Sequence, residues 1–244
     1  MRTIVLDTNV FVSALRSGGG AARQVLRRIL QGQATPLFGN TLWQEYQDLL
    51  GRDEIHINMK EVVSEFAGKV VLVTGAAGSI GSELCRQLAG MHVKQLLLFD
   101  SAETPLHNLR LEMERCYPDL KFEPIIGDVR IEKRLRMLFE KYHPQVVFHA
   151  AAYKHVPLME ENPCEAVLVN VIGSRQVADL ALEYGAEKMI MVSTDKAVNP
   201  TNVMGASKRI AEIYVQSLFK KLHESNPSAT KFITTRFGNV LDRK

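Results

Sequence analysis

Three glycines and an aspartate have the types and the spacing of residues that bind a dinucleotide. Gly75, Gly78 and Gly81 follow the apolar run 70–73, and Asp100 lies 25 residues after the first glycine. The first glycine permits a tight turn, the second lets the backbone approach a pyrophosphate, and the third lets a helix pack closely on a sheet. Asp100, which ends a second apolar run, can accept hydrogen bonds from a ribose diol. We therefore predict a dinucleotide site, against the alternative of a structural glycine-rich turn.

A helix is expected to begin directly after the second glycine, so that the free N–H groups of Ser79 and Ile80 face the phosphates. An acid at position 100 favours NAD over NADP because a carboxylate repels a 2′-phosphate. Ser101 and Ala102 follow it, and neither supplies the positive charge that a 2′-phosphate requires.

These residues need a parallel sheet to position them, and the alternation of apolar runs from Lys69 onwards predicts one. Strands are expected at 69–74, 95–99, 121–126, 146–148, 187–193 and 231–236, with helices at about 79–90, 104–116, 131–141, 160–183 and 205–223. Six alternating strands predict an α/β fold, a doubly wound parallel Rossmann sheet of order 3-2-1-4-5-6. Ligands in such sheets bind beyond the carboxyl ends of the strands.

The third and fourth strands also end in residues that suit a dinucleotide. Asp128 can accept a hydrogen bond from an adenine amino group while Val129 packs on the ring, although Asp128 can equally be a helix N-cap. Lys154 can neutralise phosphate charge or can simply be solvated. Between them, the fourth strand leads into three small residues that let a nicotinamide ribose lie against the backbone, namely Ala150, Ala151 and Ala152.

The fifth strand ends in a polar cluster that is costly to place there without a use, Thr194-Asp195-Lys196. Lys208 follows Met204 by four residues and therefore lies one helical turn along the same face. These five residues are our candidates for catalysis.

Residues 1–52 carry a different pair of candidates. Asp7 ends a short apolar strand and Glu45 lies in a helix-like segment, and two such carboxylates can hold Mg²⁺ or Mn²⁺. A capping aspartate and a solvated glutamate explain them equally well. This segment holds six arginines, no lysine and three acids, whereas residues 53–244 are balanced.

Composition indicates an ordinary soluble protein. The chain has 244 residues, of which 46% are hydrophobic and 23% charged, and its net charge of +3 is too weak to indicate nucleic-acid binding. Three distant cysteines suggest neither a disulfide framework nor a zinc site, and they fit a reducing cytoplasm. No apolar run approaches the length of a membrane span, and no signal peptide is expected.

Five motifs, in this order, resemble one branch of the extended short-chain dehydrogenase/reductase superfamily: TGAAGSIGSEL, HAAAYKHVPLME, NVIGS, STDKAVNPTNVMGASKR and TRFGNV. The branch is that of the CapD-like nucleotide-sugar 4,6-dehydratases and epimerases of bacterial polysaccharide and glycan biosynthesis, and the resemblance covers about residues 59–241. It implies a bound NAD(P), a UDP-activated N-acetylhexosamine as substrate and a 4-keto-6-deoxy sugar as product. Asn170, in the NVIGS motif, is thereby assigned to the cofactor site.

The resemblance also implies roles in a hydride circuit that oxidises C4, eliminates water across C5–C6 and returns the hydride to C6. Asp195 would be the acid, with its pKa raised by burial, and Lys196 the base at C5, with its pKa lowered by burial and by Lys208. Thr194 would bind the sugar oxygen, and Lys208 would otherwise hold the nicotinamide ribose. Met204 stands where the superfamily has a tyrosine base and cannot take a proton, as in the longer dehydratases of the branch. The base for the 4-hydroxyl stays open between Asp195 and Lys196 with Thr194.

The opening segment LDTNVFVSAL, with its glycine loop and Arg-rich helix, resembles the first half of a PIN-domain ribonuclease of the toxin–antitoxin type. In that family, residues matching Asp7 and Glu45 help to hold the catalytic metal. We expect a PIN-like α/β fragment at 1–52, a junction at 53–68 and a Rossmann domain at 69–244, without the family's C-terminal substrate domain.

The sequence supports three hypotheses about function. The first is a truncated NAD(P)-dependent nucleotide-sugar 4,6-dehydratase with a UDP-sugar as its ligand. The second is a metal-dependent ribonuclease completed by a partner chain. The third is a dinucleotide-binding module without turnover. The sequence leaves open whether the chain forms a homo-oligomer.

Overall fold

The computed structural model describes residues 2–5, 34–37, 59–225 and 230–238, with side chains for 59–221 and 230–238. The chain divides into two compact units, Met1–Ile57 and Asn58–Lys244. In the first unit, β1 (Arg2–Val5) and β2 (Ala34–Leu37) pair in parallel. The candidate metal ligands Asp7 and Glu45 lie outside the described residues.

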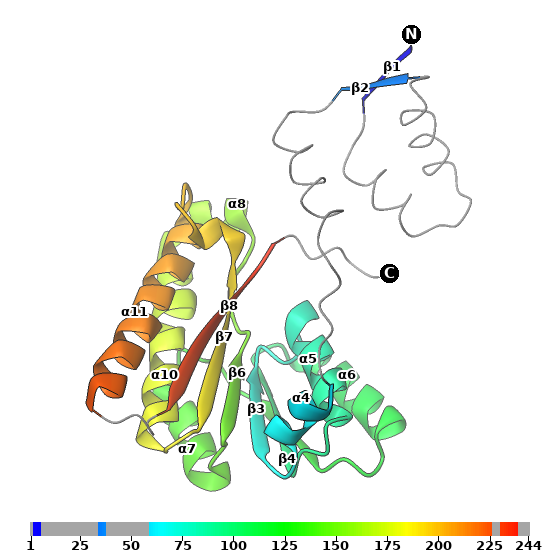
Figure 1. The fold of residues 1–244 in the computed structure, drawn as a ribbon, viewed down its shortest axis with the longest axis vertical. Coiled ribbons are helices and arrows are strands. Elements are labelled where there is room, and N and C mark those ends of the chain that lie inside the picture. Colours follow the sequence, from blue (N-terminus) through cyan, green and yellow to red (C-terminus); the bar gives the residue numbers. More distant parts are fainter. Residues whose placement is uncertain (1, 6–33, 38–58, 226–229, 239–244) are drawn as a thin grey trace. The chain divides into compact units, whose positions relative to one another are not determined.

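The second unit is built on a six-stranded sheet whose strands all pair in parallel (Figure 1). The strands are β3 (Val70–Thr74), β4 (Gln95–Asp100), β5 (Phe122–Ile126), β6 (Val146–His149), β7 (Lys188–Thr194) and β8 (Lys231–Phe237). Their order is β5-β4-β3-β6-β7-β8, which is 3-2-1-4-5-6 in sequence order. The predicted doubly wound topology is confirmed.

Helices cover both faces of this sheet, as Figure 1 shows. Those preceding β7 are α4 (Met59–Phe66), α5 (Ser79–Ala89), α6 (Glu103–Cys116), α7 (Glu132–Tyr142), α8 (Val156–Glu161), α9 (Pro163–Ala166), the π-helix η1 (Val167–Gly173) and α10 (Ser174–Glu183). The 3₁₀ turn η2 (Asp195–Ala197) and α11 (Val203–Ser225) follow β7. One core joins the sheet to α5 and α6, and the other joins it to α7, α10 and α11.

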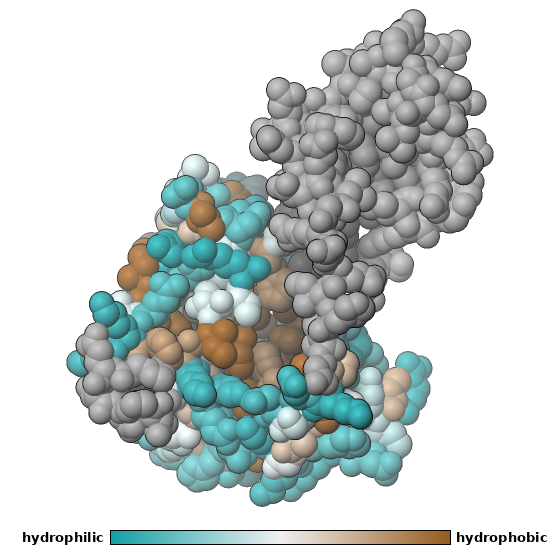
Figure 2. Space-filling view, in the orientation of Figure 1, coloured by the Kyte–Doolittle hydropathy of each residue, from teal (hydrophilic) through white to brown (hydrophobic). Residues whose placement is uncertain are grey.

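The central strands are buried on both faces, which explains their continuous apolar sequence. All five residues of β3 are buried, and Leu72 and Val73 have no exposed surface. Helix α4 adds to the core that joins the sheet to α5 and α6, because the ring of Phe66 lies 5.7 Å from that of Phe148. Figure 2 shows hydrophobic residues gathered over the sheet on this face of the second unit. Within the described part of the chain, none of the helices combines the length and the apolar character that a membrane span requires.

The segment 160–183 differs from the single helix that the sequence predicts. Helix α8 ends before Asn162, and α9 begins at Pro163, whose missing N–H suits only the first turn of a helix. The chain then passes through η1 before α10 begins at Ser174. Such π-helical turns widen a helix locally and are frequent at functional sites. Apolar periodicity does not distinguish this arrangement from an unbroken helix.

Candidate functional site

Backbone proximity requires glycine at two of the three predicted positions. Gly75 leaves β3 with a φ of +69°, and a Cβ there would lie 2.5 Å from the backbone nitrogen of Ala151. A Cβ at Gly81 would lie only 1.9 Å from the carbonyl oxygen of Gly75. Gly78 is different, because it is exposed and its Cβ would meet a single atom at 3.3 Å. It therefore lies exposed at the N-terminus of α5, where no side chain caps the helix.

Asp100 ties the glycine turn to the end of β4. One carboxylate oxygen accepts a hydrogen bond from the backbone N–H of Ala77 and the other from that of Ala102, each at 2.9 Å. A carboxylate has about four acceptor positions, so both oxygens can accept a further hydrogen bond. Asp100 is partly exposed and faces the cavity described next.

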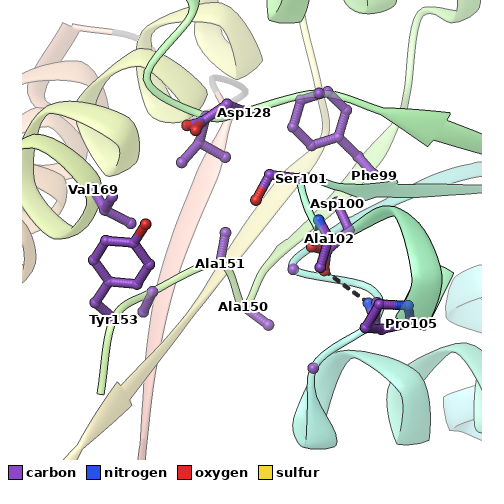
Figure 3. A pocket seen from close by; sticks show the side chains of 16 residues that line it. Phe99, Asp100, Ser101, Ala102, Pro105, Asp128, Ala150, Ala151, Tyr153 and Val169 are labelled. Atoms are coloured by element: carbon purple, nitrogen blue, oxygen red, sulfur yellow. Dashed lines mark hydrogen bonds between the residues drawn. The ribbon is translucent and has the colours of Figure 1, made fainter. Parts of the chain in front are cut away.

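A cavity of about 280 Å³, which we call cavity one, lies at the carboxyl ends of β3 to β6. Figure 3 shows Tyr153 and Val169 on one side of it and Asp100 and Ser101 on the other. Its lining includes the predicted residues Gly75, Gly78, Asp100, Asp128, Val129, Ala150, Ala151 and Ala152. The structure thus brings together candidates from four strand ends.

Asp128 forms an ion pair with Arg130, which the sequence interpretation missed. Both carboxylate oxygens accept hydrogen bonds from the guanidinium of Arg130, the shortest at 2.6 Å, and the backbone N–H of Arg130 adds another at 2.8 Å. Arg130 also donates to Glu165 at 2.7 Å. The hydrogen bond from Arg130 is the main cause of the lowered pKa of Asp128. Any ligand group that binds Asp128 must share it with Arg130.

A second cavity of about 350 Å³, cavity two, adjoins the first, because Ala150, Ala152 and Tyr153 line both. The other predicted residues in its lining are Ser79, Ile80, Lys154, Thr194, Lys196, Met204 and Lys208. No aspartate or glutamate is among the described residues that line it. Its charged lining residues are lysines, so cavity two favours an anionic ligand.

Asp195 does not follow the sequence expectation. It is not among the described residues that line either cavity, and its side chain is 54% exposed. The carboxylate accepts hydrogen bonds from the Thr194 hydroxyl at 2.8 Å and from the backbone N–H of Lys196 at 2.9 Å. Burial raises its pKa, but these donors and the charge of Lys196 outweigh that effect, and the pKa is lowered. The expectation of a raised pKa for Asp195 is therefore wrong in this structure.

Lys208 and Met204 form the buried wall of cavity two. Lys208 is 4% exposed, and its Nζ donates to the carbonyl oxygen of Val192 at 2.8 Å. Burial lowers its pKa to about 8, although Glu212 opposes that shift. Met204 is also 4% exposed and packs against Met159, so its thioether serves as apolar filling.

Asn170 lies behind the cavities and is not among the described residues that line them. It is fully buried, and its amide exchanges two hydrogen bonds with the backbone of Tyr153 at 2.9 and 3.0 Å. Lys154, by contrast, is exposed at the edge of cavity two.

Sequence reasoning also missed a buried carboxylate next to the site. Glu212 has no exposed surface and accepts hydrogen bonds from Arg236 at 2.6 Å and from Arg209 at 3.0 Å. Burial raises its pKa, but hydrogen bonds to the carboxylate, above all from Arg236, outweigh that effect and lower the pKa to about 2. The sequence gives little sign that Glu212 is buried, since its partners Arg209 and Arg236 lie 3 and 24 residues away along the chain. Among residues 59–221 and 230–238, no group of three or more potential ligands could hold a metal ion.

Two family models match the chain. One, described as polysaccharide biosynthesis protein, matches residues 71–244. The other, described as PIN domain, matches residues 3–113. The matches overlap at 71–113. In the structure these residues form strands β3 and β4 of the Rossmann sheet, together with α5 and most of α6.

Known proteins with similar sequences include the capsular polysaccharide biosynthesis protein CapD of Staphylococcus aureus, which is 46% identical over 81% of this chain and 32% of its own length. UDP-N-acetylglucosamine 4,6-dehydratase (inverting) of Campylobacter jejuni is 34% identical over 72% of this chain and 50% of its own. The X-ray structure of Pen from Bacillus thuringiensis superposes with a TM-score of 0.65 at 34% identity, covering 72% of this chain and 52% of that one.

The chain thus spans about a third to a half of the length of these relatives. The family match covers the whole sheet, including the glycine turn and the ends of β6 and β7 that form the two cavities. The chain belongs to the family of polysaccharide biosynthesis proteins.

Proposed function

We propose that the second unit binds NAD(P) in cavity one and acts in cavity two on a UDP-activated N-acetylhexosamine, as a 4,6-dehydratase of polysaccharide biosynthesis. The observation that carries this proposal is the wall shared by the two cavities. Because Ala150, Ala152 and Tyr153 line both, a ligand that fills cavity one extends to the lysines of cavity two.

The residues of cavity one fit a dinucleotide. The exposed Gly78, which has no side chain, and the uncapped N-terminus of α5 suit a pyrophosphate, which needs close backbone approach and free N–H groups. The remaining acceptor positions of Asp100 suit a ribose diol and favour NAD over NADP. When bound, the dinucleotide supplies the acceptor and donor of hydride.

Cavity two supports a nucleotide sugar as the second ligand. Lys154 and Lys208 contribute positive charge, and a sugar diphosphate carries the complementary negative charge. The names of the relatives agree with this class, since one is a capsular polysaccharide protein and another acts as a UDP-N-acetylglucosamine 4,6-dehydratase.

Loss of water across C5–C6 requires a base that removes the C5 proton and an acid that protonates the leaving C6 hydroxyl. We assign these roles to Lys196 and Asp195, with Thr194 binding the sugar oxygen. Asp195 must turn into cavity two and lose its solvent to act as an acid, because its carboxylate is exposed and its pKa is lowered. The proton of the 4-hydroxyl would pass to Asp195, or to Lys196 with Thr194, since Met204 cannot accept it.

The test uses purified protein with UDP-N-acetylglucosamine and NAD, with the sugar followed by ¹H and ¹³C NMR. We expect a 4-keto-6-deoxy product, which Lys196→Met and Asp195→Asn abolish. Lys94→Met, which removes an exposed lysine outside both cavities, serves as the control. If the protein binds NADH, as measured by its fluorescence, but yields no 4-keto sugar, a dinucleotide-binding module without turnover is the better description.

The PIN match at residues 3–113 supports a second candidate, a ribonuclease that uses Mg²⁺ or Mn²⁺ held by Asp7 and Glu45. For this candidate we keep residues 1–52 as the PIN-like fragment and 53–68 as the junction. Cleavage of single-stranded RNA that depends on added Mn²⁺ and disappears in Asp7→Asn would support it. Cleavage that persists in Asp7→Asn would assign the activity to a contaminant.

A further inference from the structure

Arg130 joins the end of β5 to helix α9. Its Nη2 donates to Asp128 Oδ2 at 2.6 Å, and its Nη1 donates to Glu165 Oε2 at 2.7 Å. Its Nε adds a bond to each Asp128 oxygen, at 3.0 Å to Oδ1 and at 2.9 Å to Oδ2. Asp128 lines cavity one, whereas Arg130 is not among the described residues that line either cavity. Arg130 can therefore affect a ligand in cavity one through the Asp128 carboxylate.

The bonds from Arg130 take up most of the hydrogen-bonding capacity of Asp128. A carboxylate has about four acceptor positions. The backbone N–H, Nε and Nη2 of Arg130 all donate to this carboxylate, which leaves about one acceptor position for a ligand. The direction of that position is fixed, because the planar guanidinium binds both oxygens and is itself held by Glu165.

The carboxylate of Asp128 also stays ionised over the neutral range of pH. The hydrogen bond from Arg130 is the main cause of its lowered pKa, and burial acts in the opposite direction. An ionised carboxylate accepts hydrogen bonds and cannot donate them. Asp128 therefore attracts an N–H group of a ligand and repels a carbonyl oxygen that is placed at the same point.

The strand order places Asp128 next to the ribose site of the proposed function. The strands β5, β4 and β3 lie side by side, and residues at their carboxyl ends line cavity one. With the pyrophosphate at Gly78 after β3 and the ribose diol at Asp100, the base of the dinucleotide reaches the end of β5, against Asp128 and Val129. Adenine presents an exocyclic amino group there, whereas hypoxanthine, like guanine, carries a carbonyl oxygen at that ring position.

We propose that Arg130 is a positioning residue that sets the base specificity of cavity one. It orients Asp128 to accept from the amino group of adenine, and the same orientation disfavours a base with a carbonyl oxygen in that place. The inference rests on the proposed function, since it takes cavity one as the dinucleotide site. Arg130 acts through Asp128 and touches no ligand.

The experiment compares the binding of NADH with that of reduced nicotinamide hypoxanthine dinucleotide, which has a carbonyl oxygen in place of the amino group of adenine. Both dinucleotides are fluorescent, so the same titration measures their Kd values. We expect the wild type to bind NADH about tenfold or more tightly than the hypoxanthine analogue, which corresponds to one hydrogen bond to a charged group. In Arg130→Met the ratio of the two Kd values should fall to about two or less, mainly through weaker binding of NADH.

Two further variants separate orientation from charge. Arg130→Lys keeps the positive charge but lacks the planar fork that binds both oxygens, so it should lose the preference for NADH as well. Glu165→Gln leaves Arg130 and Asp128 in place and weakens the bond that holds the far end of the guanidinium. It should lower the ratio of the Kd values in the same direction, and it keeps the test valid if Arg130→Met does not fold.

Arg136→Met is the matched control. Arg136 also bridges two carboxylates, those of Glu132 and Glu183, and it is not among the described residues that line the cavities. Its replacement removes a comparable ion-pair network, so both Kd values should be the same as in the wild type.

The inference is overturned if Arg130→Met binds NADH more tightly, because the arginine would then compete with the base for Asp128. It is equally overturned if the ratio of the Kd values is unchanged in Arg130→Met, or if Arg130→Lys keeps the wild-type ratio. A wild type that binds both dinucleotides equally well would also contradict it. A wild type that binds neither dinucleotide would instead refute the proposed function.

Discussion

Replacing Lys208 with methionine should stabilise the protein at neutral pH while weakening its dinucleotide site. The ammonium is 4% exposed, and burial lowers its pKa from 10.5 to about 8. At 1.36 kcal/mol per pKa unit, holding this charge in the folded state costs about 3 kcal/mol below pH 8. Methionine removes that cost and also loses the hydrogen bond to Val192, worth about 1 kcal/mol. We therefore expect Lys208→Met to be more stable by about 2 kcal/mol at pH 7.

The stabilisation expected from Lys208→Met depends on pH. Between pH 8 and 10.5 the unfolded chain binds more protons at Lys208 than the folded chain, so the wild type gains stability as the pH rises. The variant has no such gain. The advantage of Lys208→Met should therefore shrink to about zero by pH 10, where most of the cost of burying the charge has disappeared.

Urea unfolding at pH 7 and pH 10, followed by circular dichroism, measures both values. Lys220→Met, which removes an exposed lysine from the same helix, corrects for the loss of a solvated charge. A stability difference between Lys208→Met and the wild type that is equal at the two pH values would refute the reasoning. In the same variant, NADH should bind more weakly, because our proposal uses Lys208 to hold the nicotinamide ribose.

Three further substitutions test other parts of the site. Gly81→Ala places a Cβ 1.9 Å from the carbonyl oxygen of Gly75 and should lower the free energy of unfolding by about 1–3 kcal/mol or more. NADH binding, measured by fluorescence, should be lost. Gly90→Ala is the control, because its Cβ meets its nearest atom at 3.6 Å, and it should bind NADH normally. Glu212→Gln leaves two arginines without their buried carboxylate and should lower the free energy of unfolding in urea by about 3–5 kcal/mol at pH 7. This loss should shrink as the pH falls towards 2, because the wild-type carboxylate, with its pKa of about 2, is itself protonated there. Asp100→Asn should bring the Kd for NADPH closer to that for NADH, and equal preference for NADH in variant and wild type would argue against the ribose role.

The strands could be predicted from the sequence because the central ones are continuous apolar runs. Their order could be predicted because a helical segment separates each strand from the next, as in a doubly wound parallel sheet. What the sequence did not reveal depends on contacts between distant residues. Asn170 was assigned to the cofactor site by motif, yet its partners lie 17 and 37 residues away, and only the folded chain brings them together. Asp195 was expected to be buried, but the backbone of η2 gives its carboxylate local donors and leaves it exposed.

His149 and Glu212 illustrate the same limit. A histidine at a strand end and a glutamate on a helix are common in surface positions, so neither residue type signals burial. In the structure both are fully buried, and each is satisfied by hydrogen bonds from other elements. The break at Asn162 is different, because the polar Asn162-Pro163 pair signals it in the sequence and the interpretation of one long helix overlooked that signal.

The division of the two cavities along the chain has an evolutionary consequence. The lining of cavity one comes from residues between Gly75 and Val169, all of which precede β7, whereas cavity two also uses residues up to Gly238. Substitutions after β7 can therefore change the lining of cavity two while that of cavity one is retained, so under the proposed function the sugar site can diverge without disturbing the dinucleotide site. Among the described residues, Ala150, Ala152 and Tyr153 line both cavities and are under both selective constraints, so they should be the slowest part of the site to diversify.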